Sequence, residues 1–114
     1  MRTNFNMQDE NITMVKGDTL SFNVIVKDEN GEAVTVDSAV FAIRKDATTG
    51  TLVKIDLTDG ITQDDGVITV RLAPSKTSSI NSGYYYYDLR IGIDDDIYTL
   101  LRGMILFETP VKTS

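Results

Sequence analysis

The chain has 114 residues and a formal net charge of −6, with 41% hydrophobic and 25% charged residues, no cysteine and no histidine. This length and composition fit one soluble globular domain with a single modest core. The missing residue types exclude disulfides, Ser-His-Asp triads and the common zinc sites. The negative charge disfavours binding to the phosphate backbone of nucleic acids. We therefore expect a protein that is not an enzyme and has no catalytic, cofactor or metal site.

Residues 1–10 are mostly polar and predict a flexible N-terminal arm, with Phe5 and Met7 as its apolar side chains. The first twenty residues lack the apolar run of a signal peptide. No stretch approaches the ~18 apolar residues of a membrane helix. We expect a single β domain over residues 11–109, followed by a short tail over residues 110–114.

The first half of the chain alternates apolar and polar residues, which predicts half-buried strands. A short strand over residues 12–15 precedes a second strand over residues 20–26. Ile25 interrupts the polar face of that strand, so we expect this face to be partly covered. Asn30-Gly31 then predicts a hairpin turn, followed by a return strand through residues 33–36.

Alternation continues in three further segments, residues 39–44, 52–57 and 67–72, and a very short apolar piece surrounds Ile61. Pro74 ends the third segment, because proline cannot donate to a strand ladder. Residues 75–82 predict one helical turn that places Ile80 in the core, and two long strands follow, joined at Asp94-Asp95-Asp96. The pattern predicts an all-β, immunoglobulin-like antiparallel β-sandwich of about seven to nine strands.

Four consecutive tyrosines begin the first of these long strands. Tyr85 and Tyr87 share the inward face, and the hydroxyl of Tyr85 is expected to hold the preceding loop, as in a tyrosine corner. Tyr84 and Tyr86 point outward with Arg90, and exposed tyrosines are frequent anchors of protein interfaces. We therefore expect Tyr84, Tyr86 and Arg90 to contact a partner, with Phe5 and Met7 as a second contact region.

Gly103 lies inside the last strand, where a glycine weakens the strand unless something approaches the backbone closely. A tyrosine ring from the neighbouring strand, lying across Gly103, is the expected reason. This is a structural role, as are those of Tyr85 and Tyr87.

The aspartates allow other interpretations. Asp94-Asp95-Asp96 with Asp64-Asp65 and Asp59 could supply calcium ligands, but no Asp-x-Asp-x-Asp-Gly loop with a downstream glutamate is present and aspartate is common in turns. A pair of carboxylates could hydrolyse glycosides, although seventeen acidic residues always contain some pair. Glycan binding without hydrolysis is a further alternative, although the chain has no tryptophan to stack on a sugar.

Several short motifs occur in an order that resembles the immunoglobulin-like module of phage baseplate upper proteins and related minor tail proteins. The motifs are Lys16-Gly17-Asp18-Thr19, Phe22, Val24 and Val26, Ala39-x-Phe41-x-Ile43-Arg44, Asp59-Gly60-Ile61, Gly66-Val67-Ile68, Leu72-x-Pro74, Gly83-x-Tyr85-x-Tyr87-Asp88-Leu89 and Tyr98-Thr99-Leu100-Leu101-Arg102-Gly103. The resemblance implies a structural part of a phage or prophage virion, assembled in the host cytoplasm. It also implies docking on other tail or baseplate proteins and presentation of a C-terminal appendage. Because this chain ends at Ser114, we expect either that the appendage belongs to another chain, or that this chain is a stand-alone module or a trimmed piece of a longer protein.

We therefore expect a homo-oligomer that contacts other tail proteins and binds neither nucleic acid nor membrane. The alternative is a bacterial surface or adhesion module that binds a carbohydrate or protein ligand. A third possibility, an enzyme that uses carboxylates, would need a deep pocket containing acids with raised pKa values.

Overall fold

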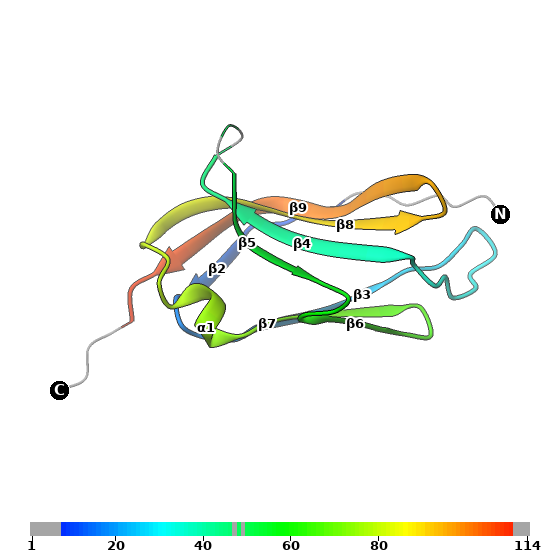
Figure 1. Cartoon of the computed structure of the whole chain (residues 1–114), viewed down its shortest axis with the longest axis horizontal. Coiled ribbons are helices and arrows are strands. Elements are labelled where there is room, and N and C mark those ends of the chain that lie inside the picture. The colour runs from blue at the N-terminus through cyan, green and yellow to red at the C-terminus, as the bar shows by residue number, and fades with distance from the viewer. Residues whose placement is uncertain (1–7, 47, 49, 111–114) are drawn as a thin grey trace.

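The computed structural model describes residues 8–46, 48 and 50–110. Within these residues the secondary structure consists of strands and one short helix (Figure 1). The elements are β1 (Gln8–Asp9), β2 (Ile12–Val15), β3 (Leu20–Ile25), β4 (Ser38–Arg44), β5 (Thr51–Asp56), β6 (Ile61–Asp64), β7 (Val67–Leu72), α1 (Pro74–Thr77), β8 (Gly83–Ile93) and β9 (Asp96–Glu108).

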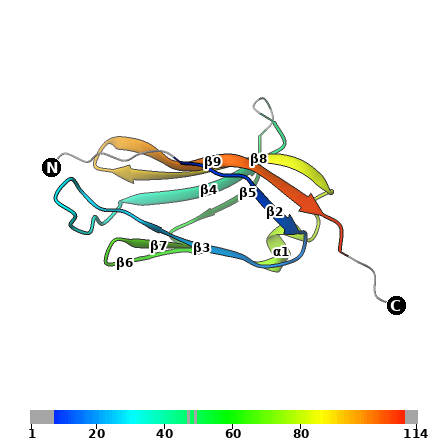
Figure 2. The ribbon, with the colours of Figure 1, turned by 180° about the vertical axis from the view of Figure 1, so that it is seen from behind.

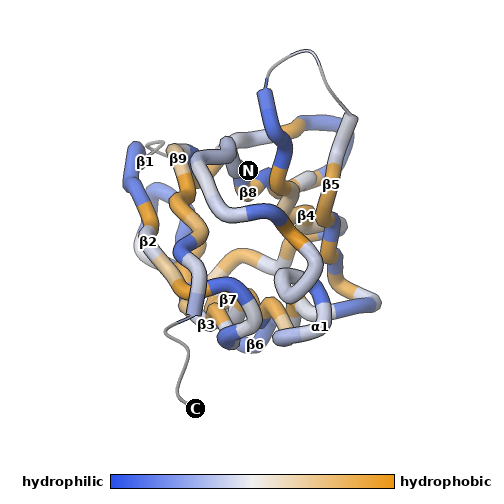
Figure 3. The backbone as a smooth tube through the Cα atoms, turned by 90° about the vertical axis from the view of Figure 1, so that its left-hand side faces the viewer, coloured by the Kyte–Doolittle hydropathy of each residue, from blue (hydrophilic) through white to orange (hydrophobic). Residues whose placement is uncertain are grey.

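The strands form two sheets. The larger sheet has the order β1-β9-β8-β4-β5, and β2 pairs with the same edge of β9 as β1, farther along the strand. The smaller sheet has the order β3-β7-β6. Figure 3 looks along the long axis and shows the two sheets enclosing an interior with many apolar positions. The prediction of a two-layered all-β domain is therefore confirmed. We call the side of the larger sheet that faces away from β3-β7-β6 the outer face.

Strand alternation puts one apolar row of each strand into the core, as predicted for β4, β5 and β7. Phe41 lies at its centre, fully buried, with its ring centroid 5.8 Å from that of Phe22 and 5.6 Å from that of Tyr87. The other fully buried large side chains are Phe107, Ile43, Ile55, Ile61, Ile68, Leu72, Leu89, Ile91, Ile105, Val26 and Val70. Burial of these side chains is the main favourable contribution to folding.

The N-terminal strands run along the edge of the larger sheet. Both β1 and β2 pair with β9 in parallel, from Gln8 opposite Leu101 to Val15 opposite Glu108 (Figure 2). The expected flexible arm included residues 8–10, but these residues are bonded to the sheet, and the Glu10 amide donates to the Arg102 carbonyl at 3.0 Å. The rest of that arm, residues 1–7, and residues 111–114 of the predicted tail lie outside the described residues.

Two expectations about the first half were wrong. Residues 33–36 form no return strand, and only an isolated bridge joins Lys27 to Ala33. Val34 and Val36 are nevertheless buried. The Val34 amide donates to the Val26 carbonyl at 3.1 Å, and the side-chain amide of Gln63 bonds both the N–H and the carbonyl of Val36 at 2.9 Å, as a neighbouring strand would. Ile25 is 65% exposed, so among the described residues nothing covers the outer side of β3 at this position.

The turns and the short helix follow the sequence predictions closely. Asp65 and Asp94 adopt positive φ angles of 49° and 55° in two acidic turns, which aspartate tolerates better than most residues. The helical turn α1 begins at Pro74, and Ile80 after it is buried. Within the described part of the chain, no helix has the length and apolar character needed to span a membrane.

Candidate partner-binding face

Strand β8 divides its four tyrosines between the two sides of the larger sheet. Tyr85 and Tyr87 are 4% and 3% exposed, whereas Tyr84 and Tyr86 are 60% and 48% exposed. This is the division that the strand period predicted. The two pairs are therefore available for different tasks.

Tyr85 holds the loop that crosses from the smaller sheet to β8. Its hydroxyl donates to the Asn81 carbonyl at 2.6 Å, and its ring meets Phe107 edge-on with centroids 5.5 Å apart. The Lys45 ammonium lies 4.5 Å from the centroid of the same ring, within the range of a cation–π contact. The predicted contact between the hydroxyl of Tyr85 and the preceding loop is present.

Tyr87 and Gly103 fix the N-terminal edge of the sheet together. The two residues are paired across β8 and β9, and the Tyr87 hydroxyl continues past Gly103 to donate to the Glu10 carbonyl at 2.5 Å. A Cβ on Gly103 would lie 3.3 Å from Tyr87 Cε1, as the expected ring contact requires, but it would overlap the Glu10 carbonyl oxygen more severely. Burial, with the nearby charges of Glu10 and Asp9, raises the pKa of Tyr87 to about 12.

The junction between β1 and β2 shows why Glu10 turns inward. At this point the Asn11 side-chain oxygen accepts the Met104 amide at 3.1 Å. The side chain thus takes the place of a backbone acceptor, and the Glu10 carbonyl is free to accept from Tyr87. This contact was not predicted, because no pattern in the sequence indicates that the N-terminal residues pair with β9.

An open groove of about 820 Å³ crosses the outer face beside Tyr86. The apolar residues Ala42 and Met104 line the groove, and Ala42 is itself buried. Met104 is paired with Tyr86 across β8 and β9. Charged side chains also line the groove, and these are Asp9, Arg44, Asp46, Asp88 and Arg102. The groove therefore combines apolar area with side chains of both signs of charge.

The remaining candidate residues are not all brought together. Arg90 is exposed and lies on the same face as Tyr86, but it pairs with Asp88 at 3.5 Å and does not line the groove. Phe5 and Met7 lie outside the described residues. Sequence reasoning missed Arg44, Arg102 and Met104, which could have been found only by pairing their strands with β8 in the correct register.

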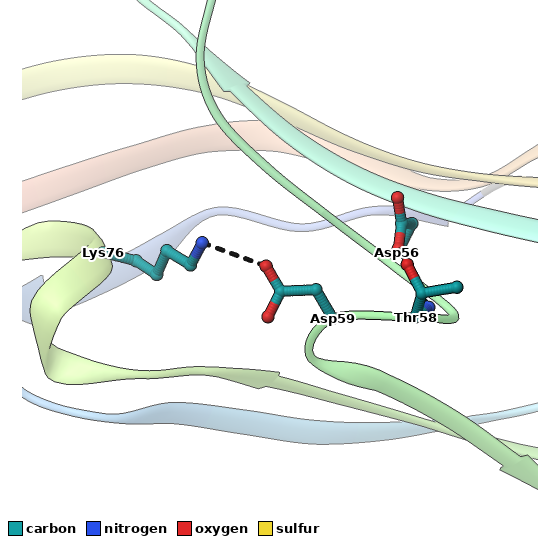
Figure 4. A network of polar contacts seen from close by, with 4 residues as sticks. All are labelled: Asp56, Thr58, Asp59 and Lys76. Atoms are coloured by element: carbon teal, nitrogen blue, oxygen red, sulfur yellow. Dashed lines mark hydrogen bonds and ion pairs between the residues drawn. The ribbon is translucent and has the colours of Figure 1, made fainter.

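Several aspartate side chains accept hydrogen bonds in the turns. The amide of Asp94 donates to Asp37 Oδ2 at 2.7 Å, and no group of three potential metal ligands occurs within residues 8–46, 48 and 50–110. Figure 4 shows the turn that crosses from β5 to β6, with Lys76 of α1 reaching toward Asp59. The backbone amide and the hydroxyl of Thr58 both donate to Asp56 Oδ1, and the Lys76 ammonium lies 3.1 Å from Asp59 Oδ2. The hydrogen bonds from Thr58 lower the pKa of Asp56, the opposite of what a general acid at neutral pH requires.

No protein-family model matches this chain, and a search of curated proteins found no significant match.

Proposed function

We propose that this chain is a non-enzymatic structural protein of a phage or prophage virion. In this proposal an immunoglobulin-like β-sandwich docks on other tail or baseplate proteins through its outer face. The observation that carries the proposal is the exposure of Tyr84 and Tyr86 on a regular sheet face, beside a groove lined by apolar and charged side chains. Tyrosine loses little conformational entropy on binding and contributes large contact areas, so such pairs are typical of protein-binding surfaces.

The immunoglobulin-like assignment is supported by strand order. In an immunoglobulin domain of the variable type, strands G, F, C and C′ form one sheet and B, E and D belong to the other. Here β9-β8-β4-β5 and β3-β7-β6 follow the same order. The hydrogen bond from Tyr85 to Asn81, at the start of the strand equivalent to F, adds the tyrosine corner of these domains.

Purified particles provide the test of the virion role. Phage particles from the strain that encodes the chain would be separated on a density gradient and analysed by mass spectrometry. We expect the chain to co-purify with tail proteins in a fixed ratio. Particles without the chain would refute the virion role, and detection of the chain on intact bacterial cells instead would favour the adhesion alternative.

A matched pair of variants tests the outer face. The double variant Tyr84→Ser, Tyr86→Ser should fold but be lost from the particles. The control is Ile25→Ser, because Ile25 is also an exposed large apolar residue, at 65%, but lies on the other sheet. If the tyrosine variant is incorporated as well as the control, the outer face is not the docking surface.

A further inference from the structure

The hydrophobic core of the sandwich is covered unequally at its two sides. Figure 3 shows β2 and β3 on one side of the interior and β5 on the opposite side. On the β5 side the inward residues Val53 and Ile55, with Ile61 of β6, are at most 6% exposed. The core is therefore sealed where the two sheets meet on this side.

The side between β2 and β3 is not sealed in this way. The inward residues of both strands pack against the core but are only partly buried. These residues, which we call the open seam, are Ile12, Met14, Leu20, Phe22 and Val24. Their neighbours on β7, Ile68, Val70 and Leu72, are at most 1% exposed, so the partial exposure is confined to the edge. An apolar row left half in water at an edge has surface that a further strand would cover.

The backbone of β3 is also unpaired along this seam. It is an edge strand, and among the described strands only β7 pairs with it. The Val26 amide donates to the Gly66 carbonyl, at the position next to the last pair of β3 and β7. Because hydrogen-bonded pairs alternate in an antiparallel ladder, the N–H and C=O groups of Ser21, Asn23 and Ile25 point away from β7. An edge of this kind is a template for strand addition.

The first seven residues of the chain have a pattern that fits this edge. They alternate strictly, with Met1, Thr3, Phe5 and Met7 in one set and Arg2, Asn4 and Asn6 in the other. No proline or glycine interrupts the run, and its length matches the six residues of β3. Added to β3 as a strand, this segment would place Phe5 and Met7 over the open seam and its polar residues toward water.

The direction of the chain argues against closure of the seam within one copy. The strands β1 and β2 run toward the turn at residues 16–19, and β3 returns from that turn in the opposite direction (Figure 2). The chain before Gln8 is therefore directed away from Leu20 and toward the Ile25 end of β3. To lie along β3 of its own copy, it would have to cross about 10 Å between the sheets and then reverse. The crossing alone takes about three residues, so too few of residues 1–7 remain to cover the seam.

We propose that residues 1–7 of a second copy add to the edge of β3 as a further strand. Backbone hydrogen bonds to Ser21, Asn23 and Ile25 hold this strand, and Phe5 and Met7 enter the open seam. In strand addition the main-chain bonds supply affinity and the alternate side chains supply specificity. The inference goes beyond the proposed function, because it concerns a surface other than the outer face and holds whether or not the chain belongs to a virion.

Sedimentation equilibrium of the full chain over a concentration series tests the role of residues 1–7. We expect the natural chain to associate, as a dimer by mutual exchange or as a larger assembly by sequential exchange. Phe5→Ser with Met7→Ser should raise the dissociation constant at least about tenfold, because two apolar side chains are no longer buried. The control Asn4→Ser with Asn6→Ser changes the same segment at the alternate positions and should associate like the natural chain.

Cross-linking locates the added strand, because the chain has no cysteine of its own. Full chains that carry Asn4→Cys are mixed with full chains that carry Asn23→Cys, oxidised, and digested for mass spectrometry of the linked peptides. The backbone of Asn23 faces the added strand, so the paired Cα atoms would lie about 5.5 Å apart, within the range of a disulfide. We expect a link between the two substituted positions. The control replaces Asn23→Cys by Thr62→Cys, at an exposed position on β6, the other edge strand of the same sheet.

Several outcomes would overturn the proposal: a natural chain that stays monomeric at millimolar concentration, equal association of the Phe5-Met7 variant and its control, or no more linking at Asn23→Cys than at Thr62→Cys. A single chain that carries both Asn4→Cys and Asn23→Cys separates the two possible sources of the strand. Links between chains support the proposal, whereas a link within one chain would show that residues 1–7 cover their own β3 and would overturn it. Should Asn23→Cys fail to fold, Ser21→Cys replaces it with the same control.

Discussion

Replacing Gly103 by alanine should separate the N-terminal edge from the sheet. The added Cβ would lie 2.7 Å from the carbonyl carbon of Glu10 and would overlap its oxygen, so the peptide after Glu10 has to move. That movement breaks the hydrogen bond from Tyr87, which contributes about 0.5–1.5 kcal/mol. The lost hydrogen bond and the strain of overpacking together should lower the free energy of unfolding by about 1–3 kcal/mol.

The change would be measured by urea and thermal unfolding followed by circular dichroism. A loss of about 1–3 kcal/mol corresponds to a fall in melting temperature of about 4–12 °C for a domain of this size. Hydrogen exchange should also accelerate at the amides of Glu10 and Met104, which bond across this edge. Gly50→Ala is the control, because a Cβ at that exposed glycine would meet nothing within 4 Å.

Equal stability of Gly103→Ala and Gly50→Ala would refute the expected clash with Glu10. Full additivity of Gly103→Ala and Tyr87→Phe in the double variant would also contradict it. Both substitutions act on the same peptide, so their effects should overlap.

Three further changes have expected outcomes. Tyr85→Phe should lower the free energy of unfolding by about 0.5–1.5 kcal/mol through loss of the hydrogen bond to Asn81, whereas Tyr86→Phe should change it little. Equal effects of the two substitutions would contradict a stabilising role for the bond from Tyr85 to Asn81. Thr77→Val should lower the free energy of unfolding by about 1–2 kcal/mol, because Thr77 is fully buried and its hydroxyl accepts a hydrogen bond from the Gly17 amide at 2.9 Å. Ser79→Ala, at an exposed site, is its control in the same unfolding assay. Folding raises the pKa of Tyr87 from 10.0 to about 12, so above pH 10 the Tyr87 hydroxyl ionises in the unfolded chain but stays protonated in the folded chain. The free energy of unfolding should therefore fall between about pH 10 and pH 12, by up to about 1.4 kcal/mol per pH unit. Tyr87→Phe should flatten this slope, and an unchanged slope would show that other groups cause it.

The strands were predictable wherever a period of two coincided with burial on one side. Residues 67–72 are the clearest case, because the predicted inward residues Ile68, Val70 and Leu72 are all buried. The tyrosine run was predictable for the same reason, and so was the division of Tyr84 to Tyr87 between the two faces. Local chemistry also predicted the turns, since aspartate tolerates the positive φ of Asp65 and Asp94.

Contacts between distant segments could not be predicted in this way. Residues 33–36 have the composition of a strand, but their backbone bonds go to the side chain of Gln63 and to Val26. The pairing of residues 8 and 9 with β9 spans more than ninety residues and carries no local pattern. The groove depended equally on register, because Met104 and Arg44 become neighbours of Tyr86 only through the pairing of three strands.

The division of labour along β8 links stability to the proposed binding. Tyr85 and Tyr87 use both ring and hydroxyl inside the fold, and each hydroxyl donates to the backbone carbonyl of a residue outside the strands, Asn81 and Glu10. Tyr84 and Tyr86 donate no side-chain hydrogen bond to any described residue, and about half or more of each side chain is exposed. Strand propensity alone would be satisfied by valine or threonine at these two positions, with less apolar surface left in water. A partner that covers these two rings would remove their apolar surface from water, and for this reason we propose the outer face as the docking surface.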